Sequence, residues 1–414
     1  MKVLNFGSCN VDHVYAVDHI IKAGETLAAR SVDVFAGGKG LNQSIALAKA
    51  GVSVYHAGII GEDGTFLKDT LVAAGVDVRF LKTEKGKSGH AIIQVDSNGE
   101  NCICVFEGTN GSVTEDYIDE VLSNFEQGDF IILQNEIPHV DHILTRAKEI
   151  GMISVLNPSP INERITALDL SCVGYLILNE TEAREISGKS DTREFIGFIR
   201  AKYPSLRVVL TLGSRGSVYF TEDEMTEMPA FCVEAKDTTS AGDTFTGYFI
   251  SFVSSGKSVK EALKYASAAS AITVSRLGAS ASVPYLKEVE EILPSLIPSR
   301  TDTEDRKSLM KKKIEEYITS CPKTASLSGL STVLGYSRTY AAALVKETTG
   351  YSFTELLLTE RCRKAAALLE KDECVGDIIK EVGYENCSFF RKKFKEIYGK
   401  TPKEYQKELR RSKT

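Results

Sequence analysis

The sequence predicts an α/β protein with a mainly parallel sheet flanked by helices and a small β lid, followed by an all-α region of two helix-turn-helix units. Three observations predict this. Apolar strand-like runs alternate with amphipathic helical patterns up to about residue 296, and two segments within that part alternate polar and apolar residues instead. A pattern of helix, glycine turn and helix then occurs twice after residue 305. Two domains of different architecture are therefore expected.

The first part contains the strand-like runs FIILQNE, ISVLNP, YLILNE and VVLTLG. Helical patterns such as HVDHILTRAKEIG and SVKEALKYASAASAITVSRLG alternate with such runs. Because parallel neighbouring strands need long crossover connections, this alternation predicts a mainly parallel sheet. The segments at about 10–35 and 88–107 have the period of strands with one exposed face. They predict a separate antiparallel lid.

The domain boundary is predicted in LPSLIPSRTDTED, where Pro294 and Pro298 interrupt the preceding helix. We expect a first domain over 1–296, a linker over 297–305 and a second domain over 306–414, with a basic helix beginning at about Arg306. Residues 1–300 carry 27 Lys and Arg against 39 Asp and Glu, a balance of −12, whereas residues 301–414 carry 23 against 17, a balance of +6. This asymmetry predicts different partners for the two domains.

Composition and the amino terminus predict a cytoplasmic protein without a membrane partner. The chain is 43% hydrophobic but has no apolar run of membrane-spanning length. Its start, MKVLNFGSCN, lacks the charged region, apolar core and cleavage site of a signal peptide. The nine cysteines are scattered, and neither they nor the six histidines have the spacing of a metal site. Reduced structural thiols are therefore expected.

The stretch DTTSAGDTFTG, residues 237–247, is the most informative for chemistry. Its small residues precede an apolar helix, and the first N–H groups of a helix have no acceptor within it. The N–H groups of Ala241 and Gly242 would form an anion hole, and Asp243 beside them would take a proton from a hydroxyl. A Gly-Asp pair before a helix also serves as a turn and cap, so this stretch alone leaves both interpretations open.

A second glycine-rich segment, FAGGKGLNQSIALAKAG, begins at Phe35 and leads into an alanine-rich amphipathic helix. Lys39 and Asn42 lie at its start, where polar side chains bind sugar hydroxyls while glycines permit close backbone approach. The segment is not a Walker phosphate loop, because it lacks the four-residue spacer and the Ser or Thr after the lysine. The segment therefore does not predict phosphoryl transfer of the kind that uses a Walker loop.

Five motifs occur in the order GGKGLN, NPSP at Asn157, LNETEA at Leu178, TLGSRG at Thr211 and DTTSAGDTF. Two more are GSxNxDH at Gly7–His13 and the QNEIP segment at 134–138. With these motifs the chain resembles the ribokinase (PfkB-type) sugar kinases over about residues 1–295. The resemblance implies a kinase that uses ATP, Mg²⁺ and K⁺, with the 5-hydroxyl of D-ribose as the expected acceptor.

The resemblance also implies roles for individual residues. Asp243 would be the catalytic base, beside the anion hole of Ala241 and Gly242. The sugar would be bound by Asp12, Gly38, Lys39, Asn42, Glu136 and Asp243. The nucleotide would be bound by Asn179, Thr211 and Gly213, and Mg²⁺ through Glu182. The K⁺ site would comprise Asp237, Thr239, Thr273, Arg276, Gly278 and Ser282. Taken alone, Asn179 and Glu182 fit a helix cap with a first-turn acid equally well. Ser267 stands where many relatives have Asn on the adenine side.

The repeated units GYSRTYAAALVKETTG and GYENCSFFRKKFKEIYG, at residues 335 and 383, resemble the AraC-type DNA-binding domain over about 306–411. The resemblance implies a double-stranded DNA partner. The expected contacts are Arg338 and Thr339 in the first unit, and Ser388, Arg391 and Lys392, with Asn386, in the second. The first unit departs from the family pattern, because alanines at 341–343 stand where polar residues are usual.

The fusion predicts an enzyme that couples sugar status to transcription, and its lid predicts a homodimer, because lids in the family often pair. One alternative is an AraC-type regulator that uses a catalytically weak kinase fold as a sugar sensor. Others are a kinase with a vestigial tail and a basic helical bundle that contacts proteins. The retention of Asp243, Glu182 and the glycine-rich turns favours an active enzyme.

Overall fold

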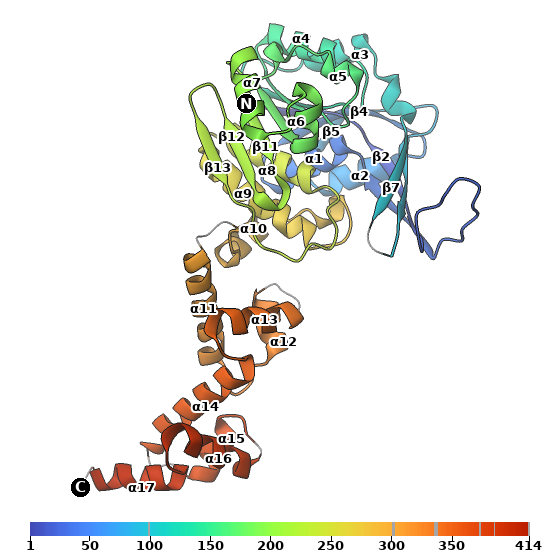
Figure 1. Ribbon diagram of the computed structural model, residues 1–414. Coiled ribbons are helices and arrows are strands. Elements are labelled where there is room, and N and C mark those ends of the chain that lie inside the picture. Colours follow the sequence, from blue (N-terminus) through green and yellow to red (C-terminus); the bar gives the residue numbers. More distant parts are fainter. Residues whose placement is uncertain (98–99, 300–302, 335–337, 372–373, 385, 413–414) are drawn as a thin grey trace. The chain divides into compact units, whose positions relative to one another are not determined.

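The computed structural model describes residues 1–97, 100–299, 303–334, 338–371, 374–384 and 386–412. The chain divides into two compact units, Met1–Arg300 and Thr301–Thr414. The first is an α/β unit and the second consists of helices (Figure 1). The fold class predicted from the sequence is confirmed in both parts.

A nine-stranded sheet forms the centre of the first unit. In spatial order its strands are β13 (Met225–Met228), β12 (Ser217–Phe220), β11 (Arg207–Thr211), β10 (Tyr175–Asn179), β9 (Ile153–Asn157), β8 (Phe130–Gln134), β1 (Val3–Phe6), β4 (Val54–Gly61) and β5 (Asp77–Glu84). Neighbours from β11 to β5 pair in parallel, while β12 and β13 are antiparallel. Since helices cover both faces, central strands such as FIILQ are buried along their whole length.

Helices form a layer on each face of this sheet (Figure 1). One layer contains α1 (Lys39–Lys49), α2 (Thr65–Ala73), α8 (Ala241–Ser254), α9 (Val259–Val274) and α10 (Leu286–Ile292). The other contains α3 (Glu115–Leu122), α4 (Val140–Ile150), α6 (Glu180–Ser187) and α7 (Thr192–Lys202). The remaining helical segments are α5 (Glu163–Thr166) and the 3-10 turns Gly108–Ser112, Leu170–Cys172, Gly213–Arg215, Ser280–Ser282 and Leu293–Ser295. Strand residues alternate between the layers: Ile132 packs with the first and Ile131 with the second.

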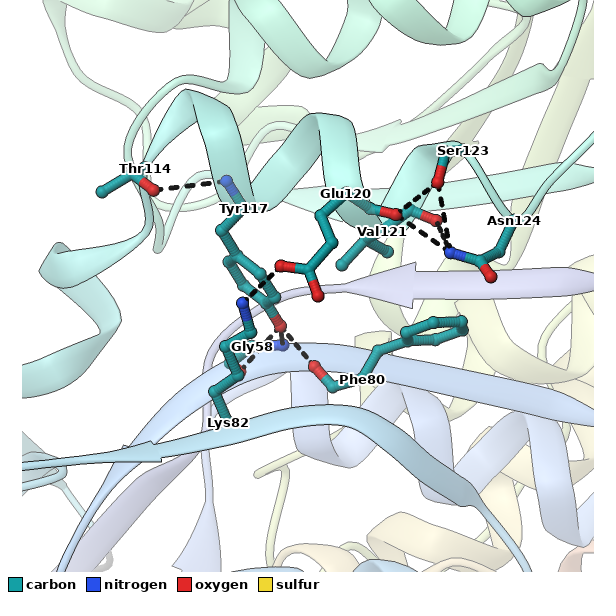
Figure 2. A network of polar contacts seen from close by, with 9 residues as sticks. All are labelled: Gly58, Phe80, Lys82, Thr114, Tyr117, Glu120, Val121, Ser123 and Asn124. Carbon is teal, nitrogen blue, oxygen red and sulfur yellow. Dashed lines mark hydrogen bonds and ion pairs between the residues drawn. The ribbon is translucent and has the colours of Figure 1, made fainter.

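Tyr117 fixes α3 to the sheet where the pairing of β4 and β5 is irregular (Figure 2). Its hydroxyl accepts from the N–H of Gly58 at 3.1 Å and contacts the carbonyl oxygens of Gly58 and Phe80. The Lys82 ammonium lies 4.2 Å from the Tyr117 ring centroid and 2.6 Å from the Glu120 carboxylate. One side chain thus hydrogen-bonds backbone groups of two neighbouring strands.

The lid is a four-stranded sheet, in the order β3 (Ser31–Gly37), β2 (Asn10–Ala16), β6 (Gly89–Val95) and β7 (Asn101–Phe106). The prediction of an antiparallel lid is wrong for its central pair, because β2 and β6 are parallel. The reason is topological. The strands β2 and β6 follow β1 and β5, which run in the same direction through the large sheet. Both hairpins therefore leave the same edge of the large sheet with their first strands in the same direction.

The second unit contains two helix-turn-helix pairs joined by a long helix. Its helices are α11 (Thr303–Ser320), α12 (Leu327–Leu334), α13 (Arg338–Thr349), α14 (Phe353–Leu369), α15 (Val375–Glu381), α16 (Cys387–Tyr398) and α17 (Pro402–Ser412). The helix expected from Arg306 begins at Thr303, inside the predicted linker. Among the described residues, no helix is both long and apolar enough to cross a membrane.

Aromatic packing and one arginine hold the second unit together. Phe390 and Phe394 of α16 are fully buried and pack with Ile379 of α15 and residues of α14. The Arg361 guanidinium on α14 donates to the carbonyls of Pro322 at 2.8 Å, Lys323 at 3.0 Å and Gly383 at 3.3 Å. The connecting helix is therefore bonded to the segment after α11 and to the turn before α16.

Candidate active site

Asp243 lies in the first turn of α8, with only 7% of its surface exposed. The helix begins after Ser240, which adopts a left-handed conformation with φ 60°. The carboxylate accepts from two amides of α1: Asn42 Nδ2 is 3.1 Å from Oδ2, and Gln43 Nε2 is 2.9 Å from Oδ1. Ala241 and Gly242, the residues predicted to form the anion hole, begin this helix, and the Ala241 N–H makes a long hydrogen bond of 3.3 Å to the Thr238 carbonyl.

Three charged residues predicted to bind sugar gather near Asp243. Burial, reinforced by the charges of Glu136 and Asp243, raises the pKa of Asp12 to about 7. Burial also raises the pKa of Glu136, against the opposing effects of Lys39 and of hydrogen bonds from the Ser8 hydroxyl and the Lys39 N–H. Burial disfavours the charge on Lys39, but the carboxylates of Asp243 and Glu136 outweigh it and raise the pKa of the ammonium. The predicted sugar residues thus form one electrostatically coupled cluster.

The glycine-rich turn lets its backbone approach this cluster. Gly38 caps α1 with φ 92°, a conformation that favours glycine, and a Cβ there would lie 3.0 Å from the Asn10 nitrogen. A Cβ on Gly37 would overlap the Asp12 carboxylate. Sequence reasoning did not single out Gly37, Ser8 or Gln43 as site residues. Gly37 and Gln43 lie in the segment FAGGKGLNQSIALAKAG and Ser8 lies in the motif GSxNxDH, but only the folded chain shows what they contact.

Two adjoining cavities lie beside Asp243. The first measures about 230 Å³ and is polar, with Lys39, Asn157, Ser159, Ile177, Leu178, Asn179, Glu182, Thr211, Thr238, Ser240, Gly242, Asp243 and Thr246 in its wall. The second measures about 460 Å³, and its more apolar wall includes Gly213, Phe231, Val233, Phe245, Ser267, Ala271 and Val274. Asn179, Thr211, Thr238 and Gly242 belong to both walls. The arrangement offers an apolar chamber next to a charged one.

Asn179 and Glu182 form a capping box at the start of α6, and both also line the polar cavity. Asn179 Oδ1 accepts from the Glu182 N–H at 3.0 Å, and Glu182 Oε2 accepts from the Asn179 N–H at 2.9 Å. The helix cap that the residues alone allowed is therefore present, and Glu182 as a whole is 8% exposed. Thr211 hydrogen-bonds the Leu178 carbonyl at 3.3 Å, which ties the ends of β10 and β11 together.

The residues predicted for K⁺ come from the segment before α8 and from the end of α9 with the residues that follow it, and Asp237 hydrogen-bonds both parts. Its carboxylate accepts from the Thr239 N–H at 2.9 Å and from the Gly278 N–H at 3.1 Å. The Thr273 carbonyl accepts from the Arg276 N–H at 3.1 Å, while the Arg276 side chain pairs with Glu288. Ser282 lies on the turn Ser280–Ser282, where its hydroxyl donates to the Ala279 carbonyl at 2.7 Å.

In the second unit, the charged residues predicted to contact DNA are exposed. Ser388, Arg391 and Lys392 occupy one face of α16, opposite the buried Phe390 and Phe394. The Asn386 Oδ1 accepts from the Phe389 N–H at 3.0 Å, so this oxygen caps α16. Arg338 is exposed at the start of α13, whereas the Thr339 side chain lies outside the described residues. Ala341 is buried in the core, while Ala343 is exposed on the same helix.

Comparisons with known proteins agree with this geometry. Residues 1–286 match the pfkB family of carbohydrate kinases, and residues 330–408 match a helix-turn-helix domain. A ribokinase of Staphylococcus aureus is 34% identical over 303 residues, which cover 70% of this chain and 99% of that protein. The crystal structure of a Cryptococcus neoformans ribokinase with ADP is similar with a TM-score of 0.63 at 32% identity, covering 70% of this chain and 99% of that one. An Arabidopsis thaliana ribokinase complexed with ribose and ATP has a TM-score of 0.62 at 28% identity, covering 70% and 98%. The chain is therefore a carbohydrate kinase of the pfkB family, with a ribokinase-type domain followed by an AraC-type helix-turn-helix domain.

Proposed function

We propose that the kinase unit, residues 1–300, transfers a phosphoryl group from ATP to the 5-hydroxyl of ribose, with Asp243 as the base. The observation that carries this proposal is the position of the Asp243 carboxylate. It lies in the wall of the polar cavity and is hydrogen-bonded by α1, the helix that follows the sugar-binding turn. The Arabidopsis ribokinase that holds ribose and ATP supports ribose as the acceptor.

Asp12, Lys39, Asn42 and Glu136, here called the sugar cluster, fit a ligand with several hydroxyl groups. Asn42 Oδ1 is buried and has no hydrogen-bond partner within the described structure. A buried acceptor of this kind is costly to leave unpaired, so a sugar hydroxyl donating to it stabilises the complex. Asp12 and Glu136 supply further acceptors and Lys39 supplies donors. Together they select a ligand with several hydroxyl groups.

Catalysis by these residues consists of proton transfer and charge stabilisation. Asp243 accepts the proton of the attacking hydroxyl, and the two amides of α1 hold its carboxylate in place. The Gly242 N–H and the Lys39 ammonium stabilise negative charge on the phosphoryl oxygens as the group transfers. The Ala241 N–H joins this anion hole once its long bond to Thr238 is exchanged for a phosphate oxygen. The apolar chamber, whose wall includes Phe231 and Phe245, accepts the adenine ring.

The predicted ions fit the donor types present. Glu182 offers one carboxylate at the polar cavity, which suits Mg²⁺ because this ion keeps most of its waters and binds few protein ligands. Glu182 would hold Mg²⁺ there, and the ion would supply positive charge that offsets the charge of the phosphates. Asp237 and Thr239, directly before the helix that carries Asp243, and Thr273 at the end of α9 offer carbonyl and carboxylate oxygens for K⁺.

A coupled assay tests the kinase proposal. ADP release is measured with ATP and Mg²⁺ for ribose, 2-deoxyribose and a panel of pentoses and hexoses, with and without K⁺. Ribose is expected to give the highest kcat/KM. Asp243→Asn is expected to lower kcat by about 10²–10⁴-fold, as loss of a general base does. Saturable ribose binding without turnover in the intact chain would contradict the proposal and favour a sugar sensor.

We propose that the helical unit, residues 301–414, binds double-stranded DNA through α16 and that ligands of the kinase unit change this binding. The path of the chain supports the coupling. The Cys232 N–H donates to the Ile297 carbonyl at 2.8 Å, and the Ser299 N–H donates to the Ala230 carbonyl at 2.7 Å. Ala230 and Phe231 line the nucleotide cavity, so the last segment of the kinase unit is bonded directly to its wall.

The coupling is tested with a duplex selected by the intact chain from a random-sequence pool. Its dissociation constant is measured alone, with ribose, with ADP, and with ribose plus a non-hydrolysable ATP analogue. A differential affinity for ligand between DNA-competent and DNA-incompetent states requires the dissociation constant to change. A selected duplex that binds equally in all four conditions would show a DNA-binding kinase without coupling. Failure to select any sequence would contradict DNA recognition itself.

We further propose that the lid forms a homodimer. Val32, Val34 and Phe106 on one face of its sheet, and Ile103 and Val105 on the other, are all more than half exposed, with 53–59% of their surface accessible. An apolar sheet surface of this kind favours pairing with another copy. Sedimentation should give a dimer for the intact chain and a monomer for Val105→Asp with Phe106→Asp.

A further inference from the structure

A chain of buried amides leads away from the carboxylate of Asp243. Gln43 has no exposed surface, and its Nε2 donates to Asp243 Oδ1 at 2.9 Å and to Asn157 Oδ1 at 3.2 Å. Its Oε1 accepts from Gln134 Nε2 at 2.7 Å. Both amide hydrogens and the carbonyl oxygen of Gln43 are therefore used, as is expected of a fully buried amide.

The orientation of each amide in this chain is fixed by Asp243. Since an ionised carboxylate only accepts hydrogen bonds, Gln43 must present its NH₂ group to it, and its oxygen must then face Gln134. Gln134 consequently donates with Nε2, both to Gln43 and to Asn5 Oδ1 at 2.9 Å. Its own Oε1 is left buried without a partner within the described structure. The unpaired Gln134 oxygen is a cost in stability that follows from the orientation of Gln43. The structure keeps this orientation despite the cost, which indicates that it is needed for something other than stability.

The far end of the chain is anchored in the sheet. Asn5 of β1 donates through Nδ2 to Ser44 Oγ at 2.8 Å and to the Gly40 carbonyl at 2.7 Å. Ser44 in turn contacts His56 Nδ1 of β4 at 2.8 Å. Because α1, β1, β4 and β8 all contribute, Gln43 is held by the rigid core of the kinase unit and has little freedom to turn.

Asn42 and Gln43 both bond Asp243, but they differ in what else they do. Asn42 has an unpaired Oδ1 and belongs to the predicted sugar set, so its contacts change when a sugar binds. Gln43 is fully bonded by protein groups on every side. Only Gln43 can therefore hold the carboxylate in the same place before and after the sugar arrives.

We propose that Gln43 is a positioning residue for the phosphoryl transfer: it fixes the plane of the Asp243 carboxylate so that Oδ2 faces the acceptor hydroxyl. This inference rests on the proposed role of Asp243 as the base. A general base must lie within hydrogen-bond reach of the proton it abstracts, and small misplacements are costly. Gln43 touches neither the sugar nor the nucleotide and acts through Asp243.

Two substitutions test the proposal. Gln43→Met keeps the length of the side chain but removes the donor, and kcat is expected to fall by about 10–100-fold as for a misplaced catalytic group, with the KM for ribose within about twofold. Gln43→Glu places a carboxylate beside that of Asp243, in a site already containing Asp12, Glu136 and Lys39. The two acids then share a proton at low pH, so the rising limb of the kcat profile moves by about one pH unit or more to higher pH.

The controls separate positioning from folding. Gln127→Met makes the same chemical change at an exposed site and should leave kcat unchanged. Thermal unfolding and ADP binding are measured for each variant, and recovery of Gln43→Glu activity at high pH shows directly that its fold is intact. A full kcat for Gln43→Met, with turnover lost in Asp243→Asn, overturns the positioning role and leaves the base in place. Retained turnover in Asp243→Asn overturns both the role of Asp243 as the base and the positioning role of Gln43. A third outcome would be lower stability, a changed KM and a lower kcat, with no shift in the pH profile of Gln43→Glu. That result would assign Gln43 a purely structural role and would also overturn the proposal.

Discussion

The kinase unit places Asp12 and Asp243, each less than a tenth exposed, beside Lys39 and Glu136, whereas the helical unit leaves Arg391 and Lys392 on an open face of α16. In the kinase unit, water is scarce around the charges, so burial and close neighbours move pKa values. In the helical unit, water and salt surround the charges and screen them. The difference predicts that stability and turnover of the kinase unit depend on pH and on the exact positions of its side chains. It also predicts that DNA binding by the helical unit depends on ionic strength.

The largest expected effect tests the buried side of this comparison. Burial and the neighbouring carboxylates raise the pKa of Asp12 from 3.8 to about 7 in the folded chain. The folded state therefore binds a proton that the unfolded state has already released between these pH values, so Asp12 lowers stability as pH rises from about 4 to 7. Asp12→Asn removes that loss. It should raise the free energy of unfolding at pH 8 by up to about 4 kcal/mol and leave it unchanged below about pH 4.

Urea unfolding of both proteins between pH 4 and pH 8 measures this difference. The same substitution should weaken ribose binding, because an amide is a poorer acceptor than a carboxylate for a sugar hydroxyl. A stability difference that does not vary with pH would show that Asp12 is ionised throughout and that burial does not govern this cluster.

Gly37 tests how strictly geometry governs the same cluster. A Cβ at this position would overlap the Asp12 carboxylate, so Gly37→Ala must push Asp12 away from the sugar. Misplacement by about 1 Å can cost about 10²-fold, and kcat/KM for ribose should fall by this order. Gly197→Ala is the matched control, since a Cβ there meets no atom within 4 Å. Equal kinetics of the two variants would show that Asp12 can move without loss.

The sequence predicted the parts of the kinase unit that depend on local pattern. Buried parallel strands and the helix that carries Asp243 lie in short segments with a recognisable composition. The sugar-binding roles of Asp12, Lys39 and Glu136 were inferred from the family resemblance and stay predictions. It did not predict the parallel pairing of β2 with β6, because that depends on how two distant hairpins leave the large sheet. Gln43 was missed for a related reason. Its partners Asp243, Gln134 and Asn157 are 91 to 200 residues away along the chain.

Tyr117 offers a test of burial away from the charged cluster. Its hydroxyl bonds backbone groups of Gly58 and Phe80 where β4 and β5 are out of register (Figure 2). Tyr117→Phe removes the hydrogen bonds of the hydroxyl to these backbone groups and should lower the free energy of unfolding by about 1–3 kcal/mol. The KM for ribose should not change. Denaturant unfolding measures the effect, and a loss below about 0.5 kcal/mol would show that the backbone at the irregularity pairs without the hydroxyl.

The smallest expected effect per residue is on DNA binding by α16. Its exposed charges are predicted to make that binding sensitive to salt. Removing an exposed cation that contacts a phosphate reduces the slope of log K against log salt by about 0.9 and weakens binding modestly. Arg391→Ala with Lys392→Ala should therefore lower that slope by about two for the selected duplex, with unchanged kinase activity. Lys257→Ala with Lys260→Ala, at exposed positions of the kinase unit, makes the same change in net charge and should leave the slope unaltered. If both pairs lowered the slope equally, DNA would respond to the total charge of the chain rather than to the face of α16. If neither pair lowered the slope, Arg391 and Lys392 would have no part in DNA binding. The predicted sensitivity of the helical unit to salt would then be wrong.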